Sequence, residues 1–121
     1  MTWRQAKVSE FRLKLYVRDL KERRRFYETT IGWPILKEFA SGVMFDTGAG
    51  VFELLEQRDA ETHNPSCDVS LEVVDVHALW RQLKDRVCVV FGVRDNAWGD
   101  TSFCIADPGG FRLTFFSPTR H

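Results

Sequence analysis

The side chains best suited to metal binding or nucleophilic chemistry are few and scattered in this sequence of 121 residues. They are three histidines and three cysteines: His63, His77, His121, Cys67, Cys88 and Cys104. No cysteine pair has the C-x-x-C spacing of a zinc or redox site, and no G-x-S-x-G nucleophile elbow is present. We therefore expect surface histidines and reduced thiols, with Cys88 and Cys104 in the core because they lie in apolar runs, and Cys67 accessible.

Composition excludes several classes of partner. Hydrophobic residues make up 44% and charged residues 28%, which is typical of a globular domain. Lys+Arg and Asp+Glu number 17 each, whereas a nucleic-acid partner usually requires a basic excess. No apolar run approaches the ~20 residues that span a bilayer, and the charged N-terminal stretch lacks the apolar core of a secretory signal. We expect a cytoplasmic protein that binds neither nucleic acid nor membrane.

The first half of the chain begins with a strand over residues 11–17, where apolar and polar side chains alternate. Asp19 follows and is typical of a helix N-cap, and a helix is predicted over residues 20–30. Three short apolar runs separated by glycine turns then predict a meander of antiparallel strands: residues 34–40, 42–48 and 50–57. The glycines of these turns precede strands and not helices, so they are not a phosphate-binding loop.

The second half repeats this order. Residues 68–74 form a predicted strand, Asp75 is the matching N-cap, and a helix is predicted over residues 76–86. Three further strands are predicted at 88–93, 101–107 and 111–117.

Two sequence repeats support this internal duplication. "LYVRDL" (15–20) matches "LEVVDV" (71–76), and "DTGAGVFELL" (46–55) matches "DPGGFRLTFF" (107–116). The sequence thus predicts an α+β fold of two βαβββ modules, residues 8–57 and 67–118, joined by a polar linker over 58–66 within a single domain, 1–121.

The chain resembles the vicinal oxygen chelate superfamily of glyoxalases, bleomycin-resistance proteins and extradiol dioxygenases. The resemblance rests on "LYVRDLKERRRFYETTIGW" in the first module and on "VSLEVVDVHAL" and "WGDTSFCIADPGG" in the second. It covers nearly the whole chain and implies two βαβββ modules whose curved sheets form a cleft, within one chain or across a dimer. Many similar small proteins are homodimers, so the resemblance also implies a homodimer.

In the metal enzymes of that superfamily, the first and last strands of each module supply His, Glu or Gln ligands. The resemblance places these positions at Arg12, Glu53, Asp68 and Thr114. A guanidinium has no lone pair to donate, and at ~4 Å and an effective dielectric near 20 each unit of like charge costs about 4 kcal/mol. We therefore expect no metal, and we expect Arg12 to form ion pairs with Glu53 and Asp68 in its place.

Aromatic residues of the strands and loops are candidates for the walls of the cleft. These are Trp33, Phe39, Phe45, Trp98 and Phe116, and Trp98 is either a lid or a buried core residue. An aromatic cleft with one cationic and two acidic groups suits an amphipathic organic ligand. Together with the four polar positions, these aromatic residues indicate a metal-free binding protein similar to those that sequester aromatic, basic antibiotics.

Two enzymatic alternatives and one structural alternative remain open from the sequence. The first is a metal-dependent lyase, isomerase or dioxygenase, with Glu53 and Asp68 as the surviving ligands. The second is metal-free acid–base catalysis by Glu53, tuned by Arg12. The third is an accessory domain that binds no ligand.

Overall fold

The computed structural model describes residues 6–60 and 67–120. The chain divides into two compact units, Met1–Ala60 and Glu61–His121, and each is described by itself. His63, His121 and residues 61–66 of the expected linker lie outside the described residues. None of the helices in the described part is long and apolar enough to cross a membrane.

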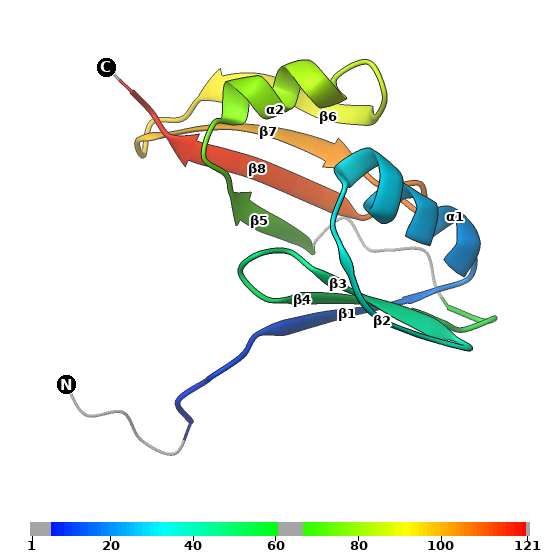
Figure 1. Cartoon of the computed structure of the whole chain (residues 1–121). Helices are drawn as coiled ribbons and strands as arrows, with labels where there is room; N and C mark the ends of the chain where they lie inside the picture. The colour runs from blue at the N-terminus through cyan, green and yellow to red at the C-terminus, as the bar shows by residue number, and fades with distance from the viewer. Residues whose placement is uncertain (1–5, 61–66, 121) are drawn as a thin grey trace. The chain divides into compact units, whose positions relative to one another are not determined.

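Unit 1 is a four-stranded sheet with helical turns against one face (Figure 1). The strands are ordered β1-β4-β3-β2, with β1 parallel to β4 and the other pairs antiparallel. The elements are β1 (Arg12–Val17), α1 (Leu20–Arg25), η1 (Phe26–Ile31), β2 (Ile35–Phe39), β3 (Gly42–Asp46) and β4 (Val51–Glu56). This order confirms the first predicted βαβββ module.

The predicted helix over 20–30 is present but changes type halfway. Asp19 caps it, because its carboxylate accepts a hydrogen bond from the Glu22 N–H at 3.1 Å. After α1 the chain continues as the π-helical segment η1, and Gly32 ends it with a left-handed φ of 87°. The wider π turn brings both Phe26 and Tyr27 into the core, where they are 8% and 0% exposed.

Unit 2 repeats the topology with strand order β5-β8-β7-β6, and β5 is parallel to β8 (Figure 1). Its elements are β5 (Asp68–Glu72), α2 (Val76–Leu83), β6 (Cys88–Asp95), β7 (Asp100–Ala106) and β8 (Arg112–Pro118). Asp75 caps α2 through the Ala78 N–H at 3.1 Å, as Asp19 caps α1. The second predicted module is therefore confirmed.

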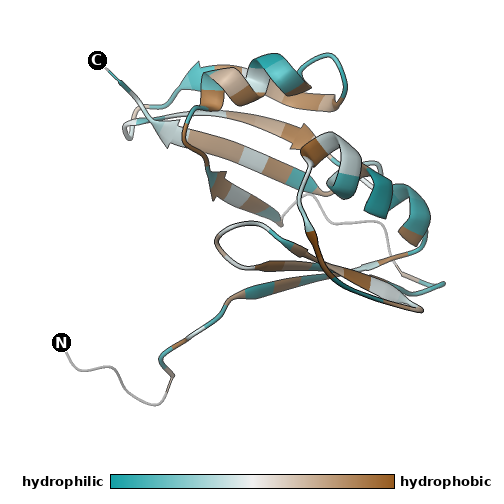
Figure 2. Ribbon diagram, in the orientation of Figure 1, coloured by the Kyte–Doolittle hydropathy of each residue, from teal (hydrophilic) through white to brown (hydrophobic). Residues whose placement is uncertain are grey.

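The core of each unit lies between the sheet and its helix. Along β8, for example, Leu113 and Phe115 are buried while Thr114 between them is partly exposed, and Figure 2 shows the alternating colours on this strand. Cys104 on the central strand β7 is 1% exposed, as predicted. Cys88 is exposed, contrary to the prediction, because β6 is an edge strand.

The two aspartate turns of the sequence repeat have the same structural role, one in each unit. Asp46 accepts a hydrogen bond from the Gly48 N–H at 2.8 Å before β4. Asp107 is buried and accepts from the N–H groups of Gly109 and Phe111, both at 2.9 Å, before β8. These turns therefore set the entry of the last strand of each unit, and they confirm that "DPGG" belongs to the repeat.

Candidate functional site

Sheet register places each polar candidate within its own unit. In unit 1, Lys14 and not Arg12 lies opposite Glu53 across the β1–β4 pair, while Arg12 lies opposite Val51. The Arg12 guanidinium is 3.5 Å from the Glu10 carboxylate on the surface. The expected ion pair between Arg12 and Glu53 is therefore wrong, because the two positions are offset by two residues along the strands.

Glu53 is the most unusual polar residue of unit 1. It lies on the face of the sheet opposite α1, because its neighbours Phe52 and Leu54 point into the core. Even so, Glu53 is only 4% exposed, and its Oε1 atom has no hydrogen-bond partner among the described residues. A buried carboxylate oxygen without a partner is costly, by about 1–3 kcal/mol or more.

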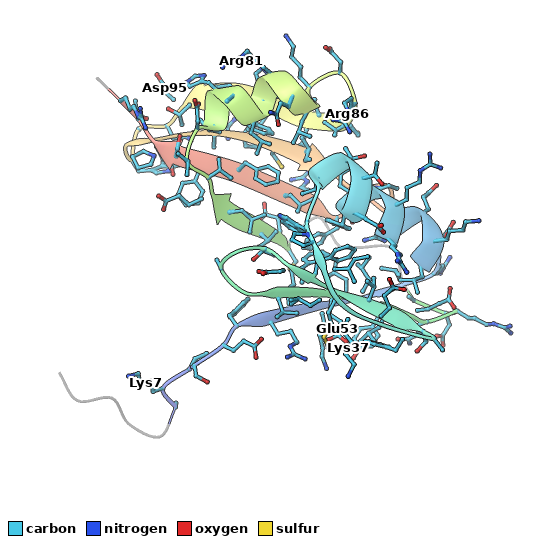
Figure 3. All side chains as sticks on the ribbon, viewed as in Figure 1. Lys7, Lys37, Glu53, Arg81, Arg86 and Asp95 are labelled. Carbon is cyan, nitrogen blue, oxygen red and sulfur yellow. The ribbon has the colours of Figure 1, made fainter. Side chains whose placement is uncertain are left out.

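A continuous row of side chains crosses the sheet at this position: Lys14, Glu53, Met44 and Lys37, on β1, β4, β3 and β2. Figure 3 labels Lys37 and Glu53 on this face. The carboxylate thus lies between two lysine positions. We call this the charged row.

The next row on the same face is apolar. It consists of Tyr16, Leu55, Gly42 and Phe39, again from all four strands. A Cβ atom added to Gly42 would lie 2.5 Å from the ring of Phe39, so the glycine allows this ring to lie flat against β3. Tyr16 and Phe39 are 49% and 37% exposed, and a ligand could therefore contact their rings. We call this the apolar row.

The equivalent row of unit 2 carries no charge. It consists of Ser70, Thr114, Cys104 and Phe91, with the Arg94 guanidinium 3.7 Å from the centre of the Phe91 ring. Burial is the main cause that raises the pKa of the Cys104 thiol above its usual value, so this sulfur is held as a neutral thiol. Thr114 therefore occupies the position of Glu53 in a row whose own four side chains are uncharged.

Neither carboxylate at the four implied positions fits a divalent metal. Glu53 has Lys14 opposite it, and Asp68 has Arg112 opposite it on β8. A neighbouring ammonium or guanidinium repels a bound divalent cation and competes for the carboxylate oxygens. Among residues 6–60 and 67–120, no group of three or more His, Cys, Asp and Glu side chains is arranged to hold a metal ion.

The predicted aromatic walls divide between two locations. Phe39 and Phe116 lie on the faces opposite the helices, where the register pairs them with Gly42 and Ser102. Phe45 instead lies in the core of unit 1, with its ring centroid 6.1 Å from that of Tyr27, and the partly buried Trp33 stacks on the same Tyr27 ring at 5.6 Å. Their assignment as cleft walls is corrected here, because both rings pack on the α1 side of the sheet.

Trp98 belongs to the turn between β6 and β7 and is 76% exposed. The alternative interpretation of Trp98 as a buried core residue is therefore wrong. The following residue, Gly99, has a left-handed φ of 102°, which explains the Trp-Gly pair as a turn.

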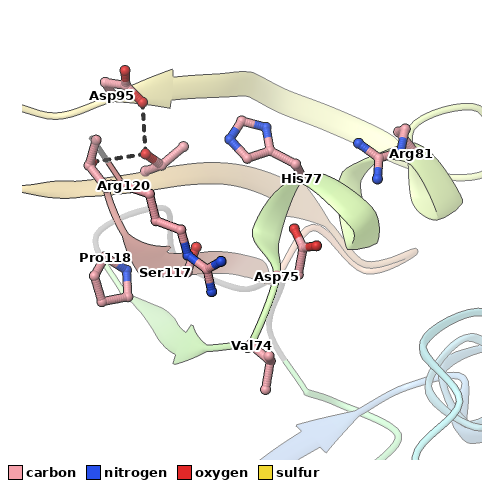
Figure 4. A pocket seen from close by; sticks show the side chains of 10 residues that line it. Val74, Asp75, His77, Arg81, Asp95, Ser117, Pro118 and Arg120 are labelled. Atoms are coloured by element: carbon pink, nitrogen blue, oxygen red, sulfur yellow. Dashed lines mark hydrogen bonds between the residues drawn. The ribbon is translucent and has the colours of Figure 1, made fainter.

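Unit 2 also contains a cavity of about 410 Å³ that the sequence did not predict (Figure 4). Its lining is mostly polar and consists of Val74, Asp75, His77, Arg81, Asp95, Thr101, Ser117, Pro118, Thr119 and Arg120. Thr101 and Ser117 have the strand parity of Phe103 and Phe115, so the cavity lies on the α2 side, opposite to Thr114. None of the candidate site residues lines it.

The sequence matches the glyoxalase-like domain family over residues 11–114. This chain belongs to that family. The match covers both βαβββ modules, as the resemblance to the vicinal oxygen chelate superfamily implied. A search of curated proteins by sequence finds no match.

Solved structures share the fold of this glyoxalase-like domain. A protein of unknown function from Agrobacterium tumefaciens is 23% identical, with a TM-score of 0.78 over 97% of this chain and 98% of the other. A glyoxalase/bleomycin resistance protein/dioxygenase from Nocardioides is 16% identical, with a TM-score of 0.78 over 95% and 86%. The bleomycin resistance determinant encoded on transposon Tn5 is 19% identical, with a TM-score of 0.76 over 93% and 100%.

Proposed function

We propose that this glyoxalase-like protein binds a small organic cation without a metal, and that Glu53 is the anchor. The buried Glu53 oxygen, which has no hydrogen-bond partner among residues 6–60 and 67–120, carries this proposal. A ligand ammonium or amidinium group can donate to that oxygen and neutralise the carboxylate. A hydrogen bond to a charged group contributes about 1.5–3 kcal/mol.

The apolar row beside Glu53 suggests the rest of the ligand. Tyr16 and Phe39 offer exposed rings, and Leu55 lies between them next to Gly42. An aromatic or aliphatic group of the ligand can stack there while its cationic group reaches the charged row. Lys14 and Lys37 on either side of Glu53 disfavour a ligand with several positive charges close together. The ligand class is therefore an amphipathic molecule with one basic group near a flat apolar part.

Structural neighbours support a function of this kind. One of them is a bleomycin resistance determinant, so bleomycin is the organic ligand chosen for the test. The proposal includes the homodimer and the cytoplasmic location implied by the resemblance and the composition. Within unit 1 it retains Arg12 as a further ligand contact, whereas Asp68, Thr114, Phe116 and Trp98 of unit 2 stay predictions from the sequence.

Calorimetric titration with metal-free bleomycin tests the role of Glu53. We expect saturable binding to the unmodified protein and a loss of about tenfold or more in affinity for Glu53→Gln, because one charge-assisted hydrogen bond is removed. Glu56→Gln is the matched control, since Glu56 is an exposed residue of the same strand and should leave affinity unchanged. Equal binding by Glu53→Gln and the unmodified protein would refute the anchor role.

The same carboxylate also favours acid–base catalysis as a second candidate. The Glu53 Oε1 atom accepts no hydrogen bond from the described residues, and in this second candidate it accepts a proton from a bound substrate. Mass spectrometry of bleomycin after incubation with the protein separates the two functions. Unchanged bleomycin supports the binding protein, whereas a new product that Glu53→Gln fails to make supports the enzyme.

A further inference from the structure

The cavity of unit 2 brings together charged groups of both signs. Figure 4 shows Asp95 toward one end and Arg81 toward the other, with His77 between them. Neither Arg81 nor Arg120 makes an ion pair within 4.0 Å in the described part of the chain. Both guanidinium groups therefore retain hydrogen-bond donors for a bound anion.

The field of these arginines reaches into the cavity. The pKa of Asp75 is lowered from its ordinary 3.8, first by the hydrogen bond from the Ala78 N–H and then by the positive charges of Arg81 and Arg120. Since the Asp75 carboxylate already caps α2, it is occupied by the helix. The guanidinium groups of Arg81 and Arg120 therefore favour a ligand anion in the cavity.

The Asp95 end of the cavity offers hydrogen-bond acceptors. Thr101 Oγ1 donates its single proton to Asp95 Oδ1 at 2.7 Å. The 2.9 Å contact between the hydroxyls of Thr101 and Thr119 must then have Thr119 as donor. The lone pairs of Thr119 and the second oxygen of Asp95 can therefore accept a hydrogen bond from a ligand. An ammonium group is the best partner there, because Asp95 is negatively charged.

We propose that this cavity binds a small zwitterion of the amino-acid class, with its carboxylate at Arg81 and Arg120 and its ammonium group at Asp95 and Thr119. The volume of about 410 Å³ is within the range of ~300–1,000 Å³ for small-molecule sites. The site lies on the α2 side of its sheet and uses no residue of the charged or apolar rows. It is therefore independent of the function proposed for Glu53.

Titration of ¹⁵N-labelled full-length protein, followed by amide NMR shifts, tests this site. L-Serine and L-glutamine are the probes, and two compounds that each lack one charge are the comparisons: serine methyl ester and L-lactate. We expect both amino acids to shift the amides of His77, Arg81, Thr101 and Thr119 saturably, with dissociation constants on the order of millimolar. Each comparison compound should bind about tenfold more weakly, because it loses one charge-assisted contact.

Two variants that each remove one positive charge complete the test. Arg120→Gln should weaken L-serine binding by about tenfold or more, whereas Arg86→Gln, an exposed arginine outside the cavity, should leave it unchanged. Glu53→Gln should also have no effect, which separates this site from the proposed cation site. The proposal is overturned if neither amino acid gives saturable shifts at these amides, if L-lactate binds as tightly as L-serine, or if Arg86→Gln weakens binding as much as Arg120→Gln.

Discussion

Tyr27→Ala should lower the free energy of unfolding by about 3–5 kcal/mol, the usual cost of truncating a large buried aromatic residue. Tyr27 is 0% exposed and is the centre of the unit 1 core. Its ring centroid is 4.5 Å from that of Phe52, 5.1 Å from that of Phe26 in an edge-on contact, and 5.6 Å from that of Trp33 in a stacked one. Alanine would remove all three contacts and leave a cavity. Urea unfolding followed by circular dichroism measures the loss.

The chain contains one other tyrosine, which makes a matched control. Tyr16 is 49% exposed on β1, so Tyr16→Ala should cost less than about 1 kcal/mol. If Tyr27→Ala does not fold, Tyr27→Leu should fold and lose an intermediate amount, because part of the apolar contact remains. Equal stability of the Tyr27 and Tyr16 variants would show that the π-helical segment does not anchor this core.

Glu53→Leu should stabilise the protein, unlike Tyr27→Ala. We expect it to raise the free energy of unfolding by about 1–3 kcal/mol in the absence of ligand. In the described part of the chain the buried carboxylate lacks a partner for Oε1, and a leucine of similar volume removes that desolvation cost. Residues kept for binding commonly reduce stability in this way, and substitution then trades function for stability. Thermal and urea unfolding of the purified variant measure the gain.

Glu56→Leu is the control for an added leucine on the same strand. Glu56 is exposed, so its substitution should change stability by no more than about 0.5 kcal/mol. A loss of stability in Glu53→Leu larger than in Glu56→Leu would mean that the Glu53 carboxylate stabilises the fold. Its unpartnered oxygen would then carry no argument for a ligand.

The fold could be predicted because its local signals repeat. Asp19 and Asp75 both precede helical periodicity, and both proved to be N-caps. The aspartate turns before the last strand of each module were visible as matching strings, and Asp46 and Asp107 form them through side-chain hydrogen bonds. Signals of this kind involve residues within a few positions of each other, so no tertiary information is needed.

Strand neighbours could not be predicted to the same accuracy. The sequence placed Arg12 and Glu53 on one face correctly, since a shift of two residues preserves the face. It could not show that Lys14 is the residue opposite Glu53, because the register of a parallel pair depends on tertiary packing. The same limit applies to Trp33 and Phe45, whose aromatic character alone did not indicate which side of the sheet they cover.

The environment of individual charged and polar side chains was the least predictable feature of the sequence. Residues 23–25 are three consecutive arginines, a run that alone predicts a solvated surface, yet Arg23 is 5% exposed, while Arg24 forms ion pairs with Glu28 and Glu38. The cavity of unit 2 is a similar case. Asp95, Thr101 and Thr119 lie on separate strand ends, and only the folded sheet brings their hydrogen bonds together.

The metal content of the protein tests the central claim most directly. The protein would be expressed in medium supplemented with zinc, manganese, nickel and iron, purified without chelators and analysed by plasma mass spectrometry beside Glu53→Ala. Lys14 opposite Glu53 and Arg112 opposite Asp68 predict only trace metal, at the same level in both proteins. Stoichiometric, tightly held metal that is lost in Glu53→Ala would contradict a metal-free binding protein.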